Sequence, residues 1–204
     1  RSARRRGYEG SRRPRFMVGP SFSRGESQMI AAEPFMLVFR FLHILSGVLW
    51  VGSAFLFVGF IGPSAAEVGP SAGPLLTAVV KKRKVAKVIT ALGGVTVLAG
   101  WIMWLRNMSL YPSLGDWVTS SFGLVLTIGG VLATISAFFG AIGVGRGVER
   151  LVDLGGEIAA AGGPPSPEQQ ARLESLSSSL ERAGKIDLLL LLLAVTSMAT
   201  ARYW

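Results

Sequence analysis

The only histidine of this 204-residue chain lies inside its first long apolar stretch, residues 35–61. Trp50 follows His43 by seven residues, which is two turns of a helix, so both side chains point the same way. Arg40 lies about one turn before His43 on that face. Ionisable side chains inside a membrane span are costly and usually face a partner rather than lipid. His43, Trp50 and Arg40 are therefore the residues at which we expect a cofactor or ligand.

A neutral imidazole such as that of His43 can bind the iron of haem b, the magnesium of a chlorin or another tetrapyrrole, or copper. A haem iron with two protein ligands would need its second one from another chain or from a methionine. Met36, Met103 and Met198 are the candidates within this sequence. A structural histidine, hydrogen-bonded within the bundle, and a proton-transferring histidine also fit the pattern.

Other catalytic groups are scarce in the sequence. A hydrolase needs a nucleophile with a base, or a metal that activates water. The chain has one histidine and no cysteine, and Asp187 and Lys87 fall at the ends of apolar stretches. We therefore expect a protein that is not an enzyme, and we place no catalytic residue.

The composition points to a membrane protein. Half of the residues are hydrophobic and 16% are charged, whereas soluble domains carry about 25% charged residues. A membrane helix needs about 20 mostly apolar residues, and four stretches come close to this length. The sequence predicts an all-α, integral membrane four-helix bundle over residues 34–204, with spans at about 35–61, 85–105, 122–144 and 186–203.

Two segments are expected to lie outside the bilayer. Residues 1–33, rich in arginine, serine and glycine, predict a disordered basic tail. Two amphipathic pieces within residues 146–185 predict a cytoplasmic helical hairpin between spans three and four. The pattern Ser166-Pro167-Glu168-Gln169 is typical of a helix start, and Gly184 is expected to end that helix.

Small residues recur at helical spacing in two of the predicted spans. Helices in lipid associate by close approach of their backbones, which small residues permit. The series could pack within its own bundle or form an interface with another subunit. Its members are Gly93 and Gly100 in the second span, and Gly129, Ala133, Ala137, Ala141 and Gly145 in the third.

The net charge of +9 does not indicate nucleic-acid binding, because membrane topology explains where the basic residues lie. Lysine and arginine concentrate on the cytoplasmic side of membrane proteins. Residues 81–87 and 146–185 supply the basic residues of the connecting segments. The sequence therefore predicts that these segments are cytoplasmic, that both termini are periplasmic, and that the protein resides in a bacterial inner membrane.

The motif His-x6-Trp-x-Gly, formed by His43, Trp50 and Gly52, resembles the first helix of a superfamily of bacterial membrane proteins. Its members include the CopD copper-resistance domain, the HemJ-type protoporphyrinogen oxidases and the membrane domain fused to some urate oxidases. The basic start of the second span and the ending MATARYW are similar to small members of this group.

The resemblance implies a four-helix membrane core. In the HemJ branch it implies a haem bound by His43, and in the CopD branch it implies the handling of copper. Taken with the many small residues, it leads us to expect an accessory subunit of a larger membrane complex, such as an electron-transfer complex. Its partners would be lipid and other membrane subunits or a second copy of the chain.

Overall fold

The computed structural model describes the backbone of residues 24–204 and the side chains from Pro34 onward. Every regular element in this range is helical, which confirms the all-α prediction. The chain divides into two units, residues 1–35 and residues 36–204, and the second unit contains the helix bundle. The predicted disordered tail falls largely on residues 1–23, which lie outside the described residues.

The first helical stretch is a long helix followed by several short segments that turn the chain back. Glycine at position 69, with φ of +64°, permits the turn, and Lys84 adopts the left-handed conformation before the next helix begins. The segments in chain order are α1 (Arg24–Leu56), the π-helical η1 (Phe57–Ile61), α2 (Gly62–Val68), the 3-10 segment η2 (Gly69–Ala72), α3 (Gly73–Thr77) and the π-helical η3 (Ala78–Lys82).

The middle of the chain crosses the length of the bundle once in each direction. Helix α4 (Val85–Met108) is followed by the short α5 (Leu114–Thr119), and then by α6 (Ser121–Phe139). Serine side chains accept hydrogen bonds from backbone N–H groups at the start of α5 and of α6, which satisfies donors that a helix start leaves free. Helix α6 continues through the π-helical η4 (Gly140–Gly145) into α7 (Arg146–Ala161) without a break.

The last helix, α8 (Pro167–Thr200), starts with the capping box of Ser166 and Gln169 that the sequence predicts, and ends in the 3-10 segment η5 (Ala201–Tyr203). The prediction that Gly184 ends a helix is wrong, because α8 passes through it. A Cβ atom built on Gly184 would lie 3.0 Å from Cγ2 of Val58. Glycine therefore serves here to let η1 approach α8, not to stop the helix.

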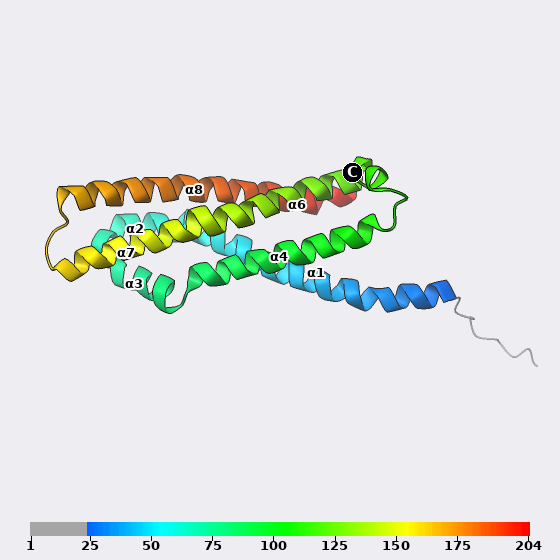
Figure 1. Ribbon diagram of the computed structural model, residues 1–204, viewed down its shortest axis with the longest axis horizontal. Helices are drawn as coiled ribbons and strands as arrows, with labels where there is room; N and C mark the ends of the chain where they lie inside the picture. Colours follow the sequence, from blue (N-terminus) through cyan, green and yellow to red (C-terminus); the bar gives the residue numbers. More distant parts are fainter. Residues whose placement is uncertain (1–23) are drawn as a thin grey trace, which may run out of the picture. The chain divides into compact units, whose positions relative to one another are not determined.

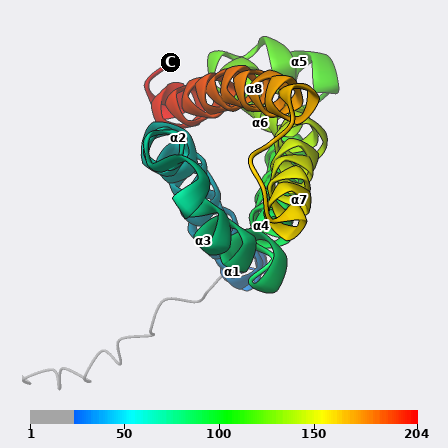
Figure 2. The same ribbon diagram turned by 90° about the vertical axis from the view of Figure 1, so that its left-hand side faces the viewer.

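The predicted hairpin is thus not a separate element. Helices α7 and α8 do pair on either side of the turn at residues 162–166, but α7 is the continuation of α6, and α8 continues through the bundle. Within residues 36–204 the long helices run alternately in opposite directions, with α6 beside α8 (Figures 1 and 2). Ser136 of α6 and Leu191 of α8 are fully buried.

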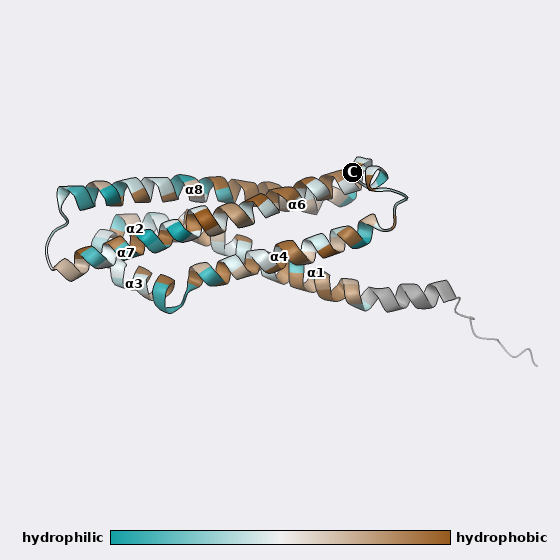
Figure 3. Cartoon of the chain, viewed as in Figure 1, coloured by the Kyte–Doolittle hydropathy of each residue, from teal (hydrophilic) through white to brown (hydrophobic). Residues whose placement is uncertain are grey.

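Four helical stretches in the described part of the chain are long and apolar enough to cross a membrane, as the sequence predicts. Apolar residues dominate the part of these helices that lies toward the α5 and C-terminal end, whereas α7 and the first half of α8 carry many hydrophilic residues (Figure 3). The four stretches are Pro34–Lys82, Val85–Met108, Ser121–Ala161 and Pro167–Tyr203.

Aromatic side chains cluster around α5. Trp117 is fully buried, and its ring meets the rings of Trp104, Tyr111 and Phe122 edge to face. Such pairs contribute about 0.5–1.5 kcal/mol beyond the area they bury. The cluster fixes the connection between α4 and α6 at this end of the bundle.

Candidate functional site

His43 lies on the face of α1 that packs against α4. Its Nδ1 donates a hydrogen bond of 2.7 Å to the backbone carbonyl oxygen of Thr96, so Nδ1 carries a proton, and in a neutral imidazole Nε2 is then the acceptor nitrogen. The ring rests on Gly100, where a Cβ atom would lie 2.9 Å from Cε1 of the imidazole. The histidine is half-buried and fixed in one orientation.

Helices α1 and α4 are joined by a second hydrogen bond and a second ring on glycine, one and two turns further along. The hydroxyl of Thr96 donates to Oγ of Ser46 at 2.8 Å. Trp50 is 5% exposed and its ring covers Gly93, where a Cβ atom would lie 2.9 Å from Cε2 of the indole. The rings of His43 and Trp50 thus rest on two glycines of α4. The seven-residue spacing of the two rings on α1 matches the seven-residue spacing of Gly93 and Gly100 on α4.

Arg40 does not join this group. It shares the spacing that places residues on one helical face, but its side chain is exposed, and no described hydrogen bond connects it to His43. The methionines considered as second haem ligands lie on three different helices. Met198 packs against Gly129 between α6 and α8, and Met36 and Met103 are half-buried on α1 and α4.

The small residues of the third predicted span lie inside the bundle. A Cβ atom on Gly129 would lie 3.0 Å from Cγ of Met198 and 3.3 Å from the carbonyl oxygen of Ala194. Ala133 is buried, and three further members of the series line the central cavity described below: Ala137, Ala141 and Gly145. Gly129 thus packs against α8 of its own chain.

A second polar group, which sequence reasoning missed, lies between α6 and α8. Asp187 is 6% exposed, and its Oδ1 accepts a hydrogen bond of 2.6 Å from the hydroxyl of Ser136, which is fully buried. We expected Asp187 at the end of a span, but α8 begins 20 residues earlier, at Pro167, and carries the carboxylate into the interior. The signal available in the sequence was an aspartate directly before six leucines.

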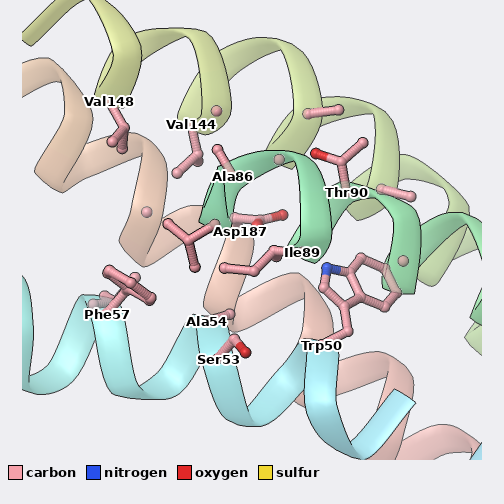
Figure 4. Close-up of a pocket in the computed structure, with 18 residues that line it drawn as sticks. Trp50, Ser53, Ala54, Phe57, Ala86, Ile89, Thr90, Val144, Val148 and Asp187 are labelled. Atoms are coloured by element: carbon pink, nitrogen blue, oxygen red, sulfur yellow. The ribbon is translucent and has the colours of Figure 1, made fainter. Parts of the chain in front are cut away.

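Beside Asp187 lies a cavity of about 100 Å³ between all four long helices. Asp187 from α8 and the indole of Trp50 from α1 extend toward the same space, with Ile89 of α4 between them (Figure 4). Thr90 of α4 also lines the cavity. Ser53 adds a hydroxyl, and most of the remaining wall is formed by apolar side chains and glycine. The lining of the cavity is thus mostly apolar, with one carboxylate and a few neutral polar groups.

A grouping of three or more potential metal ligands of the histidine, cysteine, aspartate or glutamate type is not found among the described residues. His43 and Asp187 also belong to separate sites, since Trp50 and not His43 lines the cavity. The chemistry that the structure offers is therefore either a single imidazole ligand on α1 or a single buried carboxylate on α8.

Comparison of the chain with models of protein families, with curated proteins and with solved structures finds no match.

The glycine contacts of α4 generate a prediction with a matched control. Replacing Gly93 by valine places a Cβ atom 2.9 Å from Cε2 of the Trp50 indole, whereas the neighbouring Gly94 has nothing within 4 Å of its Cβ position. Overpacking of this kind costs about 1–3 kcal/mol, and the effect of valine on the helix itself is shared by both variants. We expect Gly93→Val to lower the midpoint of thermal unfolding in detergent clearly more than Gly94→Val. Equal midpoints would show that Trp50 does not pack on α4.

Proposed function

We propose that this chain is an integral membrane protein that crosses the bacterial inner membrane four times. The support is the apolar outer surface of the helices: Leu37, Leu98, Phe138 and Leu189, one from each long helix, are between 57% and 68% exposed. Soluble monomers rarely expose large contiguous apolar patches, whereas lipid accommodates them and requires the backbone bonding that helices provide.

Within the membrane we propose a structural role, as a non-catalytic accessory subunit of a larger complex such as an electron-transfer complex. The observation that carries this proposal is that inner polar side chains are used to join helices. Such bonds fix helix positions, which a scaffold needs, and leave the outer apolar faces to lipid and to neighbouring subunits. The donors and acceptors are His43 with Thr96, Thr96 with Ser46, Trp101 with Thr134, Trp104 with Thr127, and Ser197 with the carbonyl of Val125.

Gentle extraction from the native membrane tests the structural role. The expected result is that the chain migrates in a complex larger than itself on native electrophoresis, with the same partner subunits, or a second copy of the chain, recovered by cross-linking before extraction. The presence of the same partners after extraction with two unrelated detergents is the control. A monodisperse, partnerless protein that turns over a substrate would overturn the proposal.

We also propose an orientation. Basic residues gather where η3, α7 and the first half of α8 lie, and Lys81 forms an ion pair of 2.7 Å with Asp153 there. Cytoplasmic loops are enriched in lysine and arginine. This end, with the α7–α8 hairpin, is therefore proposed to be cytoplasmic, and both termini periplasmic.

Reporter fusions test this orientation. Alkaline phosphatase folds only after export, and a standard green fluorescent protein fluoresces only if it stays in the cytoplasm. We expect phosphatase activity from a fusion after Trp204, and fluorescence from an insertion in the turn at residues 162–166. As the control, green fluorescent protein after Trp204 should not fluoresce, and alkaline phosphatase in the turn at residues 162–166 should be inactive. The opposite pattern of signals would contradict the assignment.

A second candidate function is favoured by the geometry of His43. Because Nδ1 donates to the carbonyl of Thr96, Nε2 is the nitrogen available to a metal, and metal-binding histidines usually donate their other N–H in this way. The residue therefore fits the role of an axial ligand to haem b, a redox-active group, as in a HemJ-like oxidase. Copper bound by the same nitrogen is the CopD-like alternative.

An absorption spectrum and a metal analysis of the gently extracted protein test this second candidate. A Soret band that is lost in His43→Ala and kept in Thr96→Ala is expected for haem, because Thr96→Ala retains the carbonyl that positions the imidazole. Bound copper lost in His43→Ala alone would instead support the copper alternative. The absence of both from the wild-type protein would exclude His43 as a cofactor ligand.

A further inference from the structure

The buried carboxylate of Asp187 has no positive partner among the described residues. It receives one hydrogen bond, from Ser136 to Oδ1, while Oδ2 faces the backbone of Gly140, where a Cβ atom would lie 2.9 Å away. A charge buried in an apolar interior costs several kcal/mol unless a counter-charge or hydrogen bonds compensate it. One neutral hydroxyl leaves most of this cost uncompensated.

The walls around Asp187 supply no such counter-charge. The cavity lining from α1 and η1, from α4, from α6, η4 and α7, and from α8 itself contains no charged or titratable side chain other than Asp187. Charged side chains on these elements are placed elsewhere: Lys87, Arg146 and Glu149 line a neighbouring surface groove, and Lys185 pairs with Glu181 at 2.5 Å. None of the described residues therefore supplies a positive charge to Asp187.

The cavity beside the carboxylate is suited to receive that charge. Its volume of about 100 Å³ is several times the volume of about 10–15 Å³ that a cavity needs to hold one water, so a small ion fits with part of its hydration shell. The hydroxyls of Thr90 and Ser53 can contribute oxygen atoms, and the indole N–H of Trp50, itself 5% exposed, is directed into the cavity where it can hold a water (Figure 4).

The backbone around the cavity is also unusual. Two of the π-helical segments, η1 (Phe57–Ile61) and η4 (Gly140–Gly145), contribute residues to its wall. A π-helical turn widens the helix, and such turns occur frequently at functional sites. Two of them on opposite sides of one cavity provide an observation that points to a site independently of the carboxylate.

We propose that this cavity is a binding site for a small monovalent cation, a proton or an alkali metal ion, with the Asp187 carboxylate as its charged ligand and Ser136 as the residue that positions the carboxylate. Both occupants supply one positive charge to the same oxygen atoms and would compete for them. This site is separate from His43 and does not depend on the proposed role as an accessory subunit.

The first test measures thermal unfolding of the full chain in detergent, in NaCl and in an equal concentration of N-methyl-D-glucamine chloride, whose cation is too large for the cavity. Sodium binding to the folded state raises the unfolding midpoint with increasing concentration. We expect the Na⁺-dependent rise to be lost in Asp187→Asn and retained in Asp153→Asn, which changes an exposed aspartate to the same residue.

The second test detects the proton. The sequence contains three aspartates, and Asp187 is the buried one, because Asp116 and Asp153 are exposed to solvent. Infrared spectra of wild-type protein carrying carboxyl-labelled aspartate should then show a protonated carboxyl band near neutral pH only if Asp187 holds a proton. This measurement needs no variant, so it remains decisive if Asp187→Asn fails to fold.

A Na⁺-dependent stabilisation that Asp187→Asn lacks, or a protonated aspartate band in the wild-type protein at neutral pH, supports the site and identifies its occupant. A Na⁺ effect of equal size in Asp187→Asn, or a wild-type protein with neither the stabilisation nor the protonated band, overturns the proposal. Neither outcome tests the accessory-subunit role, because that role is tested by identifying co-purifying partners.

Discussion

The close approach of α6 and α8 is the contact on which the rest of this structure depends. Helices in lipid gain no hydrophobic driving force from associating, so they are held by van der Waals contact and interhelical hydrogen bonds. Gly129 allows the carbonyl of Ala194 to approach within 3.3 Å of its Cβ position, and Ser136 bonds Asp187 further along the same contact. The other two long helices then pack against this pair and leave the central cavity.

The four helices are joined by two different means. Between α6 and α8 small residues bring the backbones together, whereas between α1 and α4 large rings fill the space and rest on glycine. His43 on Gly100 and Trp50 on Gly93 are examples of the second kind. Polar bonds accompany both kinds of contact, and each one fixes the rotation of a helix about its axis more strictly than apolar packing does, because a hydrogen bond requires a defined distance and direction.

The fold class and the face of α1 that packs inward could be predicted from the sequence, because both depend on local periodicity. The seven-residue spacing of His43 and Trp50 placed them on one face, and the structure brings both against α4. Arg40 has nearly the same spacing but is exposed, since periodicity gives the face of a helix and not the extent to which a neighbour covers it.

The remaining features depend on contacts between distant residues. The pairing of Ser136 with Asp187 joins positions 51 apart in the chain, and the six leucines after Asp187 are the one local sign that this aspartate is buried. Gly184 could be interpreted in two ways, because glycine both ends helices and permits close packing, and only the position of Val58 decides between them. The same error divided α8 into two helices and placed Asp187 at an end.

The uninterrupted length of the two central helices has a mechanical consequence. The stretch Ser121–Ala161 has 41 residues and Pro167–Tyr203 has 37, and at about 1.5 Å per residue these are rods of about 60 and 55 Å. The hydrocarbon core of a bilayer is only about 30 Å thick. In a membrane, roughly half the length of these two helices would therefore lie outside the hydrocarbon core. Because neither helix is interrupted, a tilt imposed at the end outside the bilayer would reach the point where Ser136 contacts Asp187.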